Sequence, residues 1–277
     1  MLSMLKLLTT TVLLSSVLVA NPNQKVKDFL EEKFKENPTI VNLSVEIVDR
    51  TKLRDLPGWD AVIIAVNATV KANPTNRDVS QRMIWFTNGD IITKELTNMK
   101  SGESLKNTVS PVFKESYYKK QNLIYGNADA KHKVVIFSDP LCPFCGTFVP
   151  EAIEEMKKQP KKFAIYYYHF PLAGLHPASV ELSQAAIAAD LNGIKNVALR
   201  MYNIRIDPQE RDVRKILEAF NRKMGTDLKA SDLRGTQVQE HYKSDLKIAD
   251  EVMVSGTPTM FFDGKLDRSK RLYQRVK

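Results

Sequence analysis

The stretch that most constrains the fold lies just past the middle of the chain. Residues 133–138, KVVIFS, form a short and nearly continuous apolar run, which is typical of a strand buried on both faces of a sheet. The residues DPLCPFC follow at once, and Pro143 suits the first turn of a helix. A buried strand that leads directly into a helix indicates an α/β layer.

The remainder of this half continues the same pattern. FAIYYYHF, residues 163–170, predicts a second strand, a long helical stretch follows, and residues 259–262 predict a last strand. The order is therefore strand, helix, strand, helices, strand. It predicts an α/β domain over residues 123–277 with a helical insertion at about 178–252.

The first part of the chain has a different pattern. Residues 24–36 place apolar side chains on one helical face. Runs rich in β-branched residues follow, and Asn88-Gly89 predicts a primed turn between two strands. One helix before an antiparallel sheet predicts a small α+β domain over residues 21–97. Residues 98–122 carry no strong period and predict a linker that is helical in its second half.

Residues 1–20 are typical of a targeting segment. MLSMLK carries one positive charge, LLTTTVLLSSVLV is apolar, and Ala20 offers a small residue at a cleavage site. This order predicts a cleaved secretory signal, and an uncleaved N-terminal anchor is the alternative. Both readings place the rest of the chain outside the cytoplasm, and we expect the periplasm, where disulfides form and persist.

The charge of the chain speaks against a nucleic-acid partner. The formal net charge is +9, but the lysines and arginines are spread along the whole sequence. No basic run is interleaved with aromatic residues in the way that nucleic-acid binding requires. A solvated basic surface, which favours acidic or unfolded partners, is the interpretation that fits.

Cys142 and Cys145 are the only cysteines among the 277 residues. Attachment of haem c requires a histidine where the chain has Gly146. A structural zinc site needs four ligands, and the spacing of His169 and His176 from the cysteines fits no zinc module. A structural disulfide between residues three apart would constrain almost no loop. A redox-active pair remains, and we expect it to need neither a metal nor an organic cofactor. The two histidines are expected to pack or hydrogen-bond rather than to relay protons.

The position of the pair predicts a role for each cysteine. If Pro143 opens a helix, Cys142 lies at the helix N-terminus, where unpaired N–H groups and the helix dipole favour a thiolate. Cys145 lies one turn further in and should be more buried. We therefore expect Cys142 to be the nucleophile and Cys145 to resolve the mixed disulfide. Pro143 stiffens the turn and Phe144 offers no hydrogen bond to the sulfur, so both residues should tune the redox poise.

Two segments together resemble the catalytic domain of the thioredoxin superfamily. They are FSDPLCPFC, residues 137–145, and VSGTPTMFFDGK, residues 254–265. The helical insertion and YHFPLAGLHP, residues 168–177, resemble the Dsb branch in particular. This resemblance covers residues 123–277 and implies a thioredoxin fold. It also implies that Pro258 is a cis-proline beside the cysteine pair and that Thr257 and Pro258 orient the substrate strand.

The whole arrangement is similar to the dimeric DsbC and DsbG proteins. The resemblance implies that residues 21–97 form a cystatin-like dimerisation domain and that the protein is a homodimer with a cleft for clients. It implies a periplasmic thiol–disulfide oxidoreductase that forms or isomerises disulfide bonds in unfolded secreted proteins, together with a membrane redox partner. The direction of electron flow stays open. A chaperone-like binder of unfolded chains, with secondary redox chemistry, is the alternative function.

Overall fold

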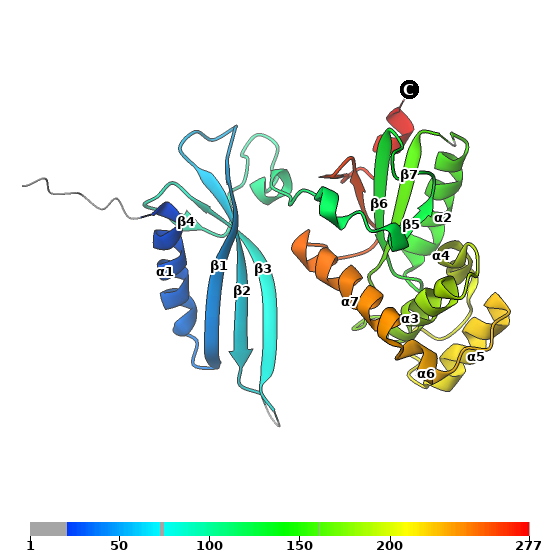
Figure 1. Cartoon of the computed structure of the whole chain (residues 1–277). Helices are drawn as coiled ribbons and strands as arrows, with labels where there is room; N and C mark the ends of the chain where they lie inside the picture. The colour runs from blue at the N-terminus through cyan, green and yellow to red at the C-terminus, as the bar shows by residue number, and fades with distance from the viewer. Residues whose placement is uncertain (1–20, 73–74, 160, 277) are drawn as a thin grey trace, which may run out of the picture. The chain divides into compact units, whose positions relative to one another are not determined.

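The computed structural model describes residues 21–72, 75–159 and 161–276, so the expected signal at residues 1–20 lies outside the described residues. The chain divides into two compact units, residues 1–94 and 95–277 (Figure 1). Within the described part, no helix is both long and apolar enough to cross a membrane.

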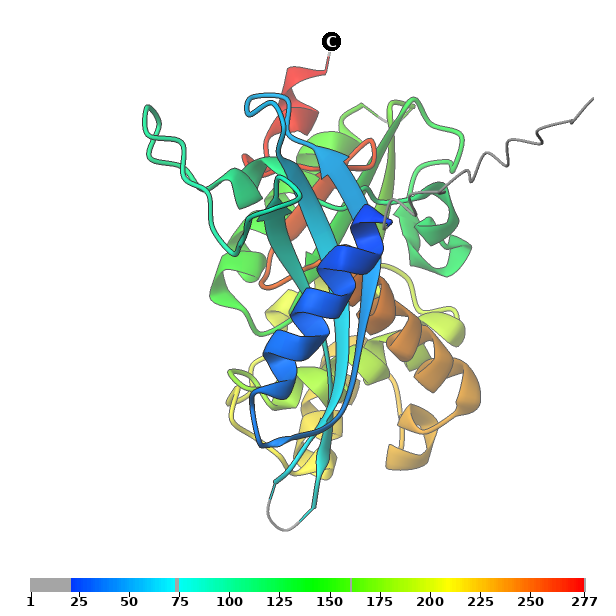
Figure 2. The ribbon, with the colours of Figure 1, turned by 90° about the vertical axis from the view of Figure 1, so that its left-hand side faces the viewer.

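The first unit packs one helix on an antiparallel sheet, as predicted. Its elements are α1 (Pro22–Lys35), β1 (Ile40–Lys52), β2 (Asp60–Val70), β3 (Arg77–Thr87) and β4 (Ile92–Thr93), and the strand order is β1-β2-β3-β4. Figure 2 shows α1 lying across one face of the sheet. Val26 and Leu30 of the helix are buried against Val45, Val62 and Ile64 of the strands.

The connection between β3 and β4 differs from the predicted two-residue turn. It is a loop of residues 88–91, closed by a hydrogen bond of 3.2 Å from Asn88 N to Ile91 O. The side-chain Oδ1 of Asn88 accepts from Asp90 N and Ile91 N at 3.1 and 2.8 Å. Because the asparagine side chain takes over these N–H groups, the tight turn is replaced and β4 is short.

Residues 98–122 were predicted to be a linker with a helical second half, and that half contains 3₁₀ turns in place of an α-helix. The segment belongs to the second unit and holds three 3₁₀ turns, Leu105–Thr108, Glu115–Tyr117 and Lys120–Asn122. Phe113 is the physical reason, because its ring is only 2% exposed and lies among five other aromatic rings. Burial of that ring, with Phe113 N donating to Gly264 O at 2.8 Å, holds the backbone along the sheet instead of in a helix.

The second unit is built on a five-stranded sheet of order β5-β7-β6-β8-β9. The strands are β5 (Leu123–Tyr125), β6 (His132–Ser138), β7 (Phe163–His169), β8 (Thr259–Phe262) and β9 (Lys265–Leu266). β6 is parallel to β7 and antiparallel to β8. Every residue of β7 is buried, which agrees with the continuous apolar character that the sequence shows.

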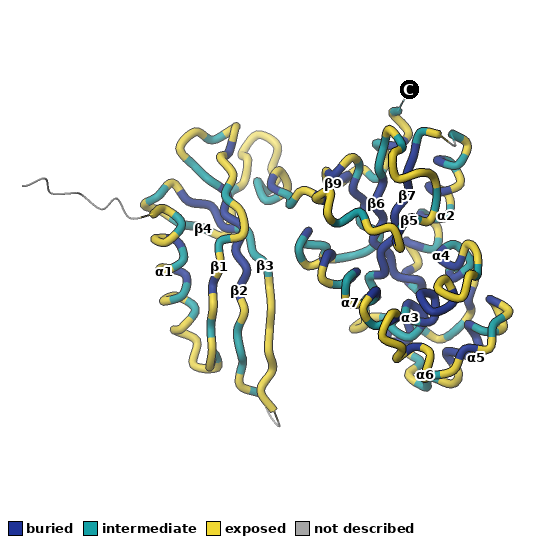
Figure 3. Tube along the Cα trace, in the orientation of Figure 1, coloured by how far each residue is buried: buried dark blue, intermediate teal, exposed yellow. Residues whose placement is uncertain are grey.

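Helices follow where the sequence predicts them. α2 (Pro143–Lys157) comes directly after β6 and contains Pro150. The insertion between β7 and β8 holds α3 (Ala178–Leu191), α4 (Val197–Arg200), the 3₁₀ turn η4 (Met201–Asn203), α5 (Val213–Met224), α6 (Ala230–Leu233) and α7 (Thr236–Glu251). A further 3₁₀ turn, Leu272–Arg275, lies near the end of the chain. The buried residues gather along the central strands and on the inner faces of these helices (Figure 3).

The central sheet separates two apolar clusters. Ile136 and Tyr167 point to one face and join residues of α2, α3, α4 and α5 together with both cysteines. Phe137 and Tyr168 point to the other face and join Phe113 and residues of α7. Successive residues of a strand alternate between faces, so β6 and β7 supply side chains to both clusters.

Candidate active site

The cysteine pair lies at the start of α2, just after the end of β6. Cys142 is the N-cap residue of α2, with extended backbone angles, and its carbonyl accepts from Gly146 N at 3.0 Å. Cys142 is 5% exposed and Cys145 is fully buried, and both cysteines are free thiols. The geometry therefore matches the expected placement of Cys142 at the helix N-terminus and of Cys145 one turn inside.

The two residues between the cysteines face different surroundings. Pro143 is the first residue of α2, where a missing N–H costs the helix nothing. Phe144 is 77% exposed, so its ring is available to a partner rather than to the core.

Thr257 and Pro258 lie against the cysteine pair although they are more than a hundred residues away in sequence. The peptide bond between them is cis, in agreement with the sequence prediction. The Sγ of Cys142 donates to the carbonyl oxygen of Thr257 at 3.7 Å. The antiparallel pairing of β8 with β6 brings the two segments together, because Phe137 is the register partner of Thr259.

A buried carboxylate supports the loop before the cysteines. Asp139 is fully buried, and its Oδ1 accepts from Leu141 N at 2.7 Å and from Ser179 Oγ at 2.6 Å. Its Oδ2 accepts from Leu172 N at 2.7 Å and lies 3.0 Å from His176 Nδ1. These bonds tie the loop to the segment after β7 and to the first turn of α3, so His176 has a positioning contact near the site.

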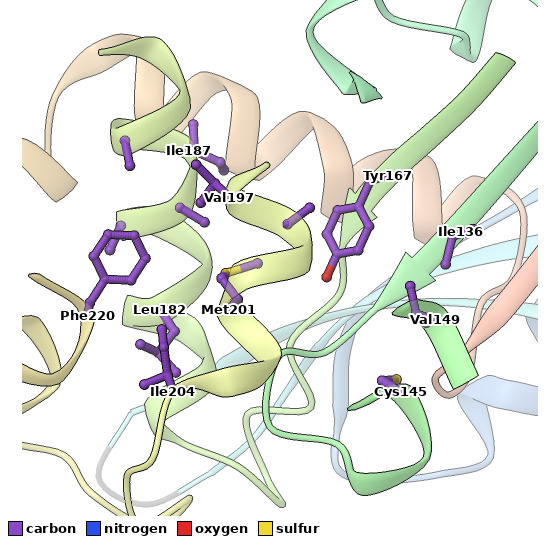
Figure 4. Close-up of a cluster of buried hydrophobic side chains, with 14 of the residues drawn as sticks. Ile136, Cys145, Val149, Tyr167, Leu182, Ile187, Val197, Met201, Ile204 and Phe220 are labelled. Atoms are coloured by element: carbon purple, nitrogen blue, oxygen red, sulfur yellow. The ribbon is translucent and has the colours of Figure 1, made fainter. Parts of the chain in front are cut away.

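Three hydroxyl groups meet in the cluster that holds Cys145. Ser138 Oγ lies 2.6 Å from Tyr202 Oη, which in turn lies 3.0 Å from Tyr167 Oη. Figure 4 shows Tyr167 and Cys145 within this buried cluster. Burial raises the pKa of Cys145 to about 11, and the side chains of Ser138 and Thr257 offset part of that effect. Burial also raises the pKa of Tyr202 well above its usual value.

Sequence reasoning did not find this hydroxyl cluster. Tyr202 comes from η4 in the insertion, 64 positions from Ser138. No local pattern couples residues so far apart, and a single tyrosine in a helical stretch has the appearance of a core residue. The one available signal was the pair of polar residues, Ser138 and Asp139, at the end of an otherwise apolar strand.

His169 lies in a separate polar cluster. Its backbone N–H donates to Asp245 Oδ2 at 2.9 Å, and Asn122 Nδ2 donates to Asp245 Oδ1 at 2.8 Å. His241 Nε2 lies 3.6 Å from the same carboxylate. Burial lowers the pKa of His169 to about 3 and of His241 to about 4, and it raises the pKa of Asp245 to about 8. This cluster ties β7 to α7, and among the described residues no hydrogen bond joins it to the cysteines.

Among residues 21–72, 75–159 and 161–276, no group of three or more histidine, cysteine, aspartate or glutamate residues could hold a metal ion.

Comparison with known proteins places this geometry in a family. The thioredoxin family model matches residues 118–276, more than half of the chain. A curated relative, the Na(+)/H(+) antiporter NhaA 1 of Mycolicibacterium gilvum strain PYR-GCK, is 28% identical over 151 residues, which are 52% of this chain and 24% of the antiporter. The chain spans about a quarter of the length of the curated relatives it matches.

Two solved structures are also similar to this chain. BdbD from Bacillus subtilis is 18% identical with a TM-score of 0.47, covering 60% of this chain and 92% of BdbD. A thioredoxin-like oxidoreductase from Silicibacter pomeroyi DSS-3 is 20% identical with a TM-score of 0.46, covering 54% of this chain and 84% of the oxidoreductase. On the strength of the family model, which spans the sheet, the cysteine pair and the segment around Pro258, the chain belongs to the thioredoxin family.

Proposed function

We propose that the protein is a periplasmic thiol–disulfide oxidoreductase that forms or isomerises disulfide bonds in secreted proteins. The observation that carries the proposal is the contact of the Cys142 sulfur with the carbonyl of Thr257, at the N-terminus of α2. It puts a reactive sulfur beside a backbone group that a substrate strand could use. Cys145, buried one turn behind, is placed to act second.

The proposed reaction proceeds in two exchanges. The thiolate of Cys142, the N-cap residue of α2, attacks a substrate disulfide and forms a mixed disulfide while one substrate sulfur leaves as a thiolate. Cys145 then attacks the Cys142 sulfur, the Cys142–Cys145 disulfide forms, and the second substrate sulfur leaves. The substrate gains two electrons and the pair loses two. Starting from the oxidised pair, the same steps run in reverse and deliver a disulfide to the substrate.

The proposed substrates are unfolded, cysteine-containing secreted proteins. The exposed ring of Phe144 supports this, because it offers an apolar contact beside the reacting sulfur. A periplasmic location rests on the sequence of residues 1–20, and turnover would require a redox partner, which we place in the membrane. Thr257 and Pro258 are proposed to orient the substrate strand, and Pro143 and Phe144 to tune the redox poise.

We also propose that residues 21–97 mediate a homodimer. The support is a sheet with open edges: among the described strands, β4 covers only Phe86 and Thr87 of β3, and none pairs with the far side of β1. Sedimentation of the full chain at micromolar concentration should give a dimer, and a monomer at that concentration would refute the assembly.

The redox proposal is tested by reduction of insulin. Cys142→Ser should lower the rate about a thousandfold or more, because the attacking sulfur is lost. Cys145→Ser should trap mixed disulfides with substrates, which non-reducing gels would show as higher-mass bands. An unchanged rate in Cys142→Ser would reject the oxidoreductase.

A double Cys142→Ala/Cys145→Ala variant separates the redox enzyme from a chaperone-like binder. It should lose both insulin reduction and disulfide formation. If it also suppresses aggregation of a cysteine-free client as well as the unaltered protein does, binding is independent of the thiols and the chaperone-like function is favoured.

A further inference from the structure

The resolving sulfur faces an electrostatic problem. Cys145 is fully buried among apolar side chains such as Ile136 and Val149, yet it must act as a thiolate to attack the mixed disulfide. A thiolate in such surroundings is costly unless a donor reaches it. Burial alone raises the pKa of Cys145, as the value of about 11 reflects.

The buried carboxylates in the described part of the chain are already engaged elsewhere. Asp139 has its four hydrogen bonds to the loop and to α3. Asp245 accepts from Asn122 and from the backbone of His169, and Asp267 accepts from the backbone near the end of the chain. The hydroxyl groups of the cluster and the buried hydroxyl of Thr257 are therefore the polar side chains that remain for Cys145. Of these, Ser138 is the one that a further hydroxyl group, that of Tyr202, can orient.

Those hydroxyl groups converge from three separate elements. Ser138 is the last residue of β6 and is fully buried, Tyr167 comes from β7, and Tyr202 comes from η4. Tyr202 also lies over α2, because a Cβ added at Gly146 would be 4.0 Å from its ring. The 2.6 and 3.0 Å spacings of the three oxygens are those of hydrogen bonds.

The donor directions in this cluster can be aligned. Tyr167 Oη–H can donate to Tyr202 Oη, and Tyr202 Oη–H can donate to Ser138 Oγ, since either atom of each pair may serve as donor. The single proton of Ser138 is then free for the sulfur. Aligned hydroxyl dipoles strengthen one another, and a donor to an ionised acceptor makes a stronger bond than one to a neutral acceptor.

We propose that Ser138, oriented by Tyr202 and Tyr167, donates the hydrogen bond that stabilises the Cys145 thiolate during the resolving step. This inference rests on the proposed oxidoreductase function. Ser138 would touch the reacting sulfur, whereas Tyr202 and Tyr167 are positioning residues. The lowering effect of Ser138 on the pKa of Cys145 agrees with this arrangement.

The step balances without a further reactant. The S–H proton of Cys145 passes to solvent water, the thiolate attacks the sulfur of Cys142 in the mixed disulfide, and the bond from Cys142 to the substrate sulfur breaks. The departing substrate sulfur accepts the electron pair of that bond and takes up one proton from solvent water, so one proton is released and one is consumed. The three hydroxyl groups turn their protons toward Cys145 and stay neutral throughout.

Reaction of the reduced protein with 5,5′-dithiobis(2-nitrobenzoate) tests the inference. Attack by Cys142 releases one coloured thiolate, and attack by Cys145 on the resulting mixed disulfide releases a second, so stopped-flow absorbance resolves the two steps. Ser138→Ala should slow the second release about tenfold or more and leave the first within twofold. Tyr202→Phe should slow the second release by a smaller factor, because Ser138 keeps its hydroxyl.

Two further measurements separate this role from a structural one. The rate of the second release should rise with pH along a curve displaced to higher pH in Ser138→Ala, and Ser138→Thr should restore it. Tyr168→Phe is the matched control, since that hydroxyl lies on the other face of β7 and donates to Tyr117 O. It should leave both releases unchanged.

The outcomes distinguish the two proposals. If the unaltered protein shows no biphasic release and no insulin reduction, the oxidoreductase function itself fails. Suppose instead that the unaltered protein is active, and that Ser138→Ala and Tyr202→Phe both release the second thiolate at a rate within twofold of that of the unaltered protein. The proposed role of the hydroxyl groups is then overturned.

Discussion

The sheet of residues 21–94 and the sheet of residues 95–277 bury their side chains in different ways. In the first, the described apolar cluster lies between α1 and the strands, and residues 77–81 of β3 are exposed. In the second, apolar clusters lie on both faces and β7 is buried throughout. The cysteine pair and its hydroxyl groups belong entirely to the second unit. A reacting sulfur can be fully buried only if helices cover the face of the sheet on which it lies. The second unit has both these helices and the cysteine pair.

The chain carries a built-in means of observing the two units separately. Its two tryptophans, Trp59 and Trp85, both lie in the first unit. Tryptophan emission therefore reports unfolding of the first unit, while thiol reactivity and tyrosine circular dichroism report the second. If the two units are as independent as the comparison implies, each substitution below should move one signal and leave the other in place.

The largest effect is expected for Gly126→Ala in the second unit. Gly126 has a φ of 82°, and an added Cβ would lie 2.0 Å from the carbonyl oxygen of Phe163 in β7. Because the carbonyl oxygen is a backbone atom and the position of the Cβ is fixed by the backbone of residue 126, relief requires β5 to separate from β7. We expect a loss of stability of more than about 4 kcal/mol. Guanidinium unfolding followed by tyrosine circular dichroism measures it.

Gly174→Ala is the control for that substitution. At Gly174 an added Cβ would have no atom within 4 Å, and the backbone is not left-handed. The stability of the protein should therefore change by less than about 0.5 kcal/mol in Gly174→Ala. A tryptophan transition that moves with Gly126→Ala would show that the units unfold together.

Leu30→Ala should produce the mirror result in the first unit. Leu30 is fully buried in the apolar cluster between α1 and the sheet. Its truncation leaves a cavity and should lower the free energy of unfolding by about 2–5 kcal/mol. The midpoint of tryptophan emission in guanidinium should fall while insulin reduction stays unchanged. Phe29→Ala, at a neighbouring position that is 47% exposed, should cost much less. Loss of insulin reduction in Leu30→Ala would mean that the site depends on the first unit.

The two units also differ in how far their structure could be predicted. The helix and antiparallel sheet of the first unit follow from periodicity, and β6, α2 and the cysteines follow from one contiguous motif. The cis bond before Pro258 was implied by resemblance. These features depend on neighbours in sequence, or on a motif whose two halves occur together.

Features that depend on unrelated long-range contacts escaped prediction. The second half of the linker was expected to be helical because Ser110-Pro111 can start a helix, whereas Phe113 packs on Phe137 and Phe261. The bond from Ser138 to Tyr202 likewise joins a strand end to the insertion. Their contact energy comes from tertiary packing, which overrides local propensity.

A pH effect of intermediate size should arise from the buried cluster around Asp245. Because burial raises its pKa from 3.8 to about 8, the folded protein keeps a proton that the unfolded chain loses. This carboxyl group therefore lowers stability progressively as pH rises from about 4 to 8. The lowered pKa values of His169 and His241 have the opposite effect on stability. As pH falls below about 6.5, these histidines take up protons in the unfolded chain but not in the folded protein, so stability falls with falling pH.

Asp245→Asn isolates the first of these contributions. Between about pH 7.5 and 8.5 the histidines of the unfolded chain are almost fully neutral and contribute little slope, so the unaltered protein should lose stability across this window and Asp245→Asn should lose less. Denaturant midpoints followed by tyrosine circular dichroism at several pH values provide the measurement. Glu240→Gln, an exposed carboxylate on the same helix, should keep the slope of the unaltered protein. Equal slopes in Asp245→Asn and the unaltered protein would contradict the assignment, and a shift of tryptophan emission would place the effect outside the second unit.

The smallest effect is expected for Lys33→Ala on the exposed face of α1. Lys33 Nζ lies 2.7 Å from Glu36 Oε2, but both side chains are more than half exposed, so solvent screens the pair and its loss should cost less than about 0.5 kcal/mol. Arg50 and Asp60, at the same 2.7 Å distance, are only 20% and 22% exposed, and Arg50→Ala should therefore cost more. Tryptophan emission in denaturant at low and high salt compares the two. Because a screened surface pair weakens further with salt, the small difference caused by Lys33→Ala should vanish at high salt while that of Arg50→Ala persists. A larger loss of stability in Lys33→Ala than in Arg50→Ala would mean that side chains of the first unit are buried too little to strengthen an ion pair. The difference in burial between the two units would then be greater than their apolar clusters alone indicate.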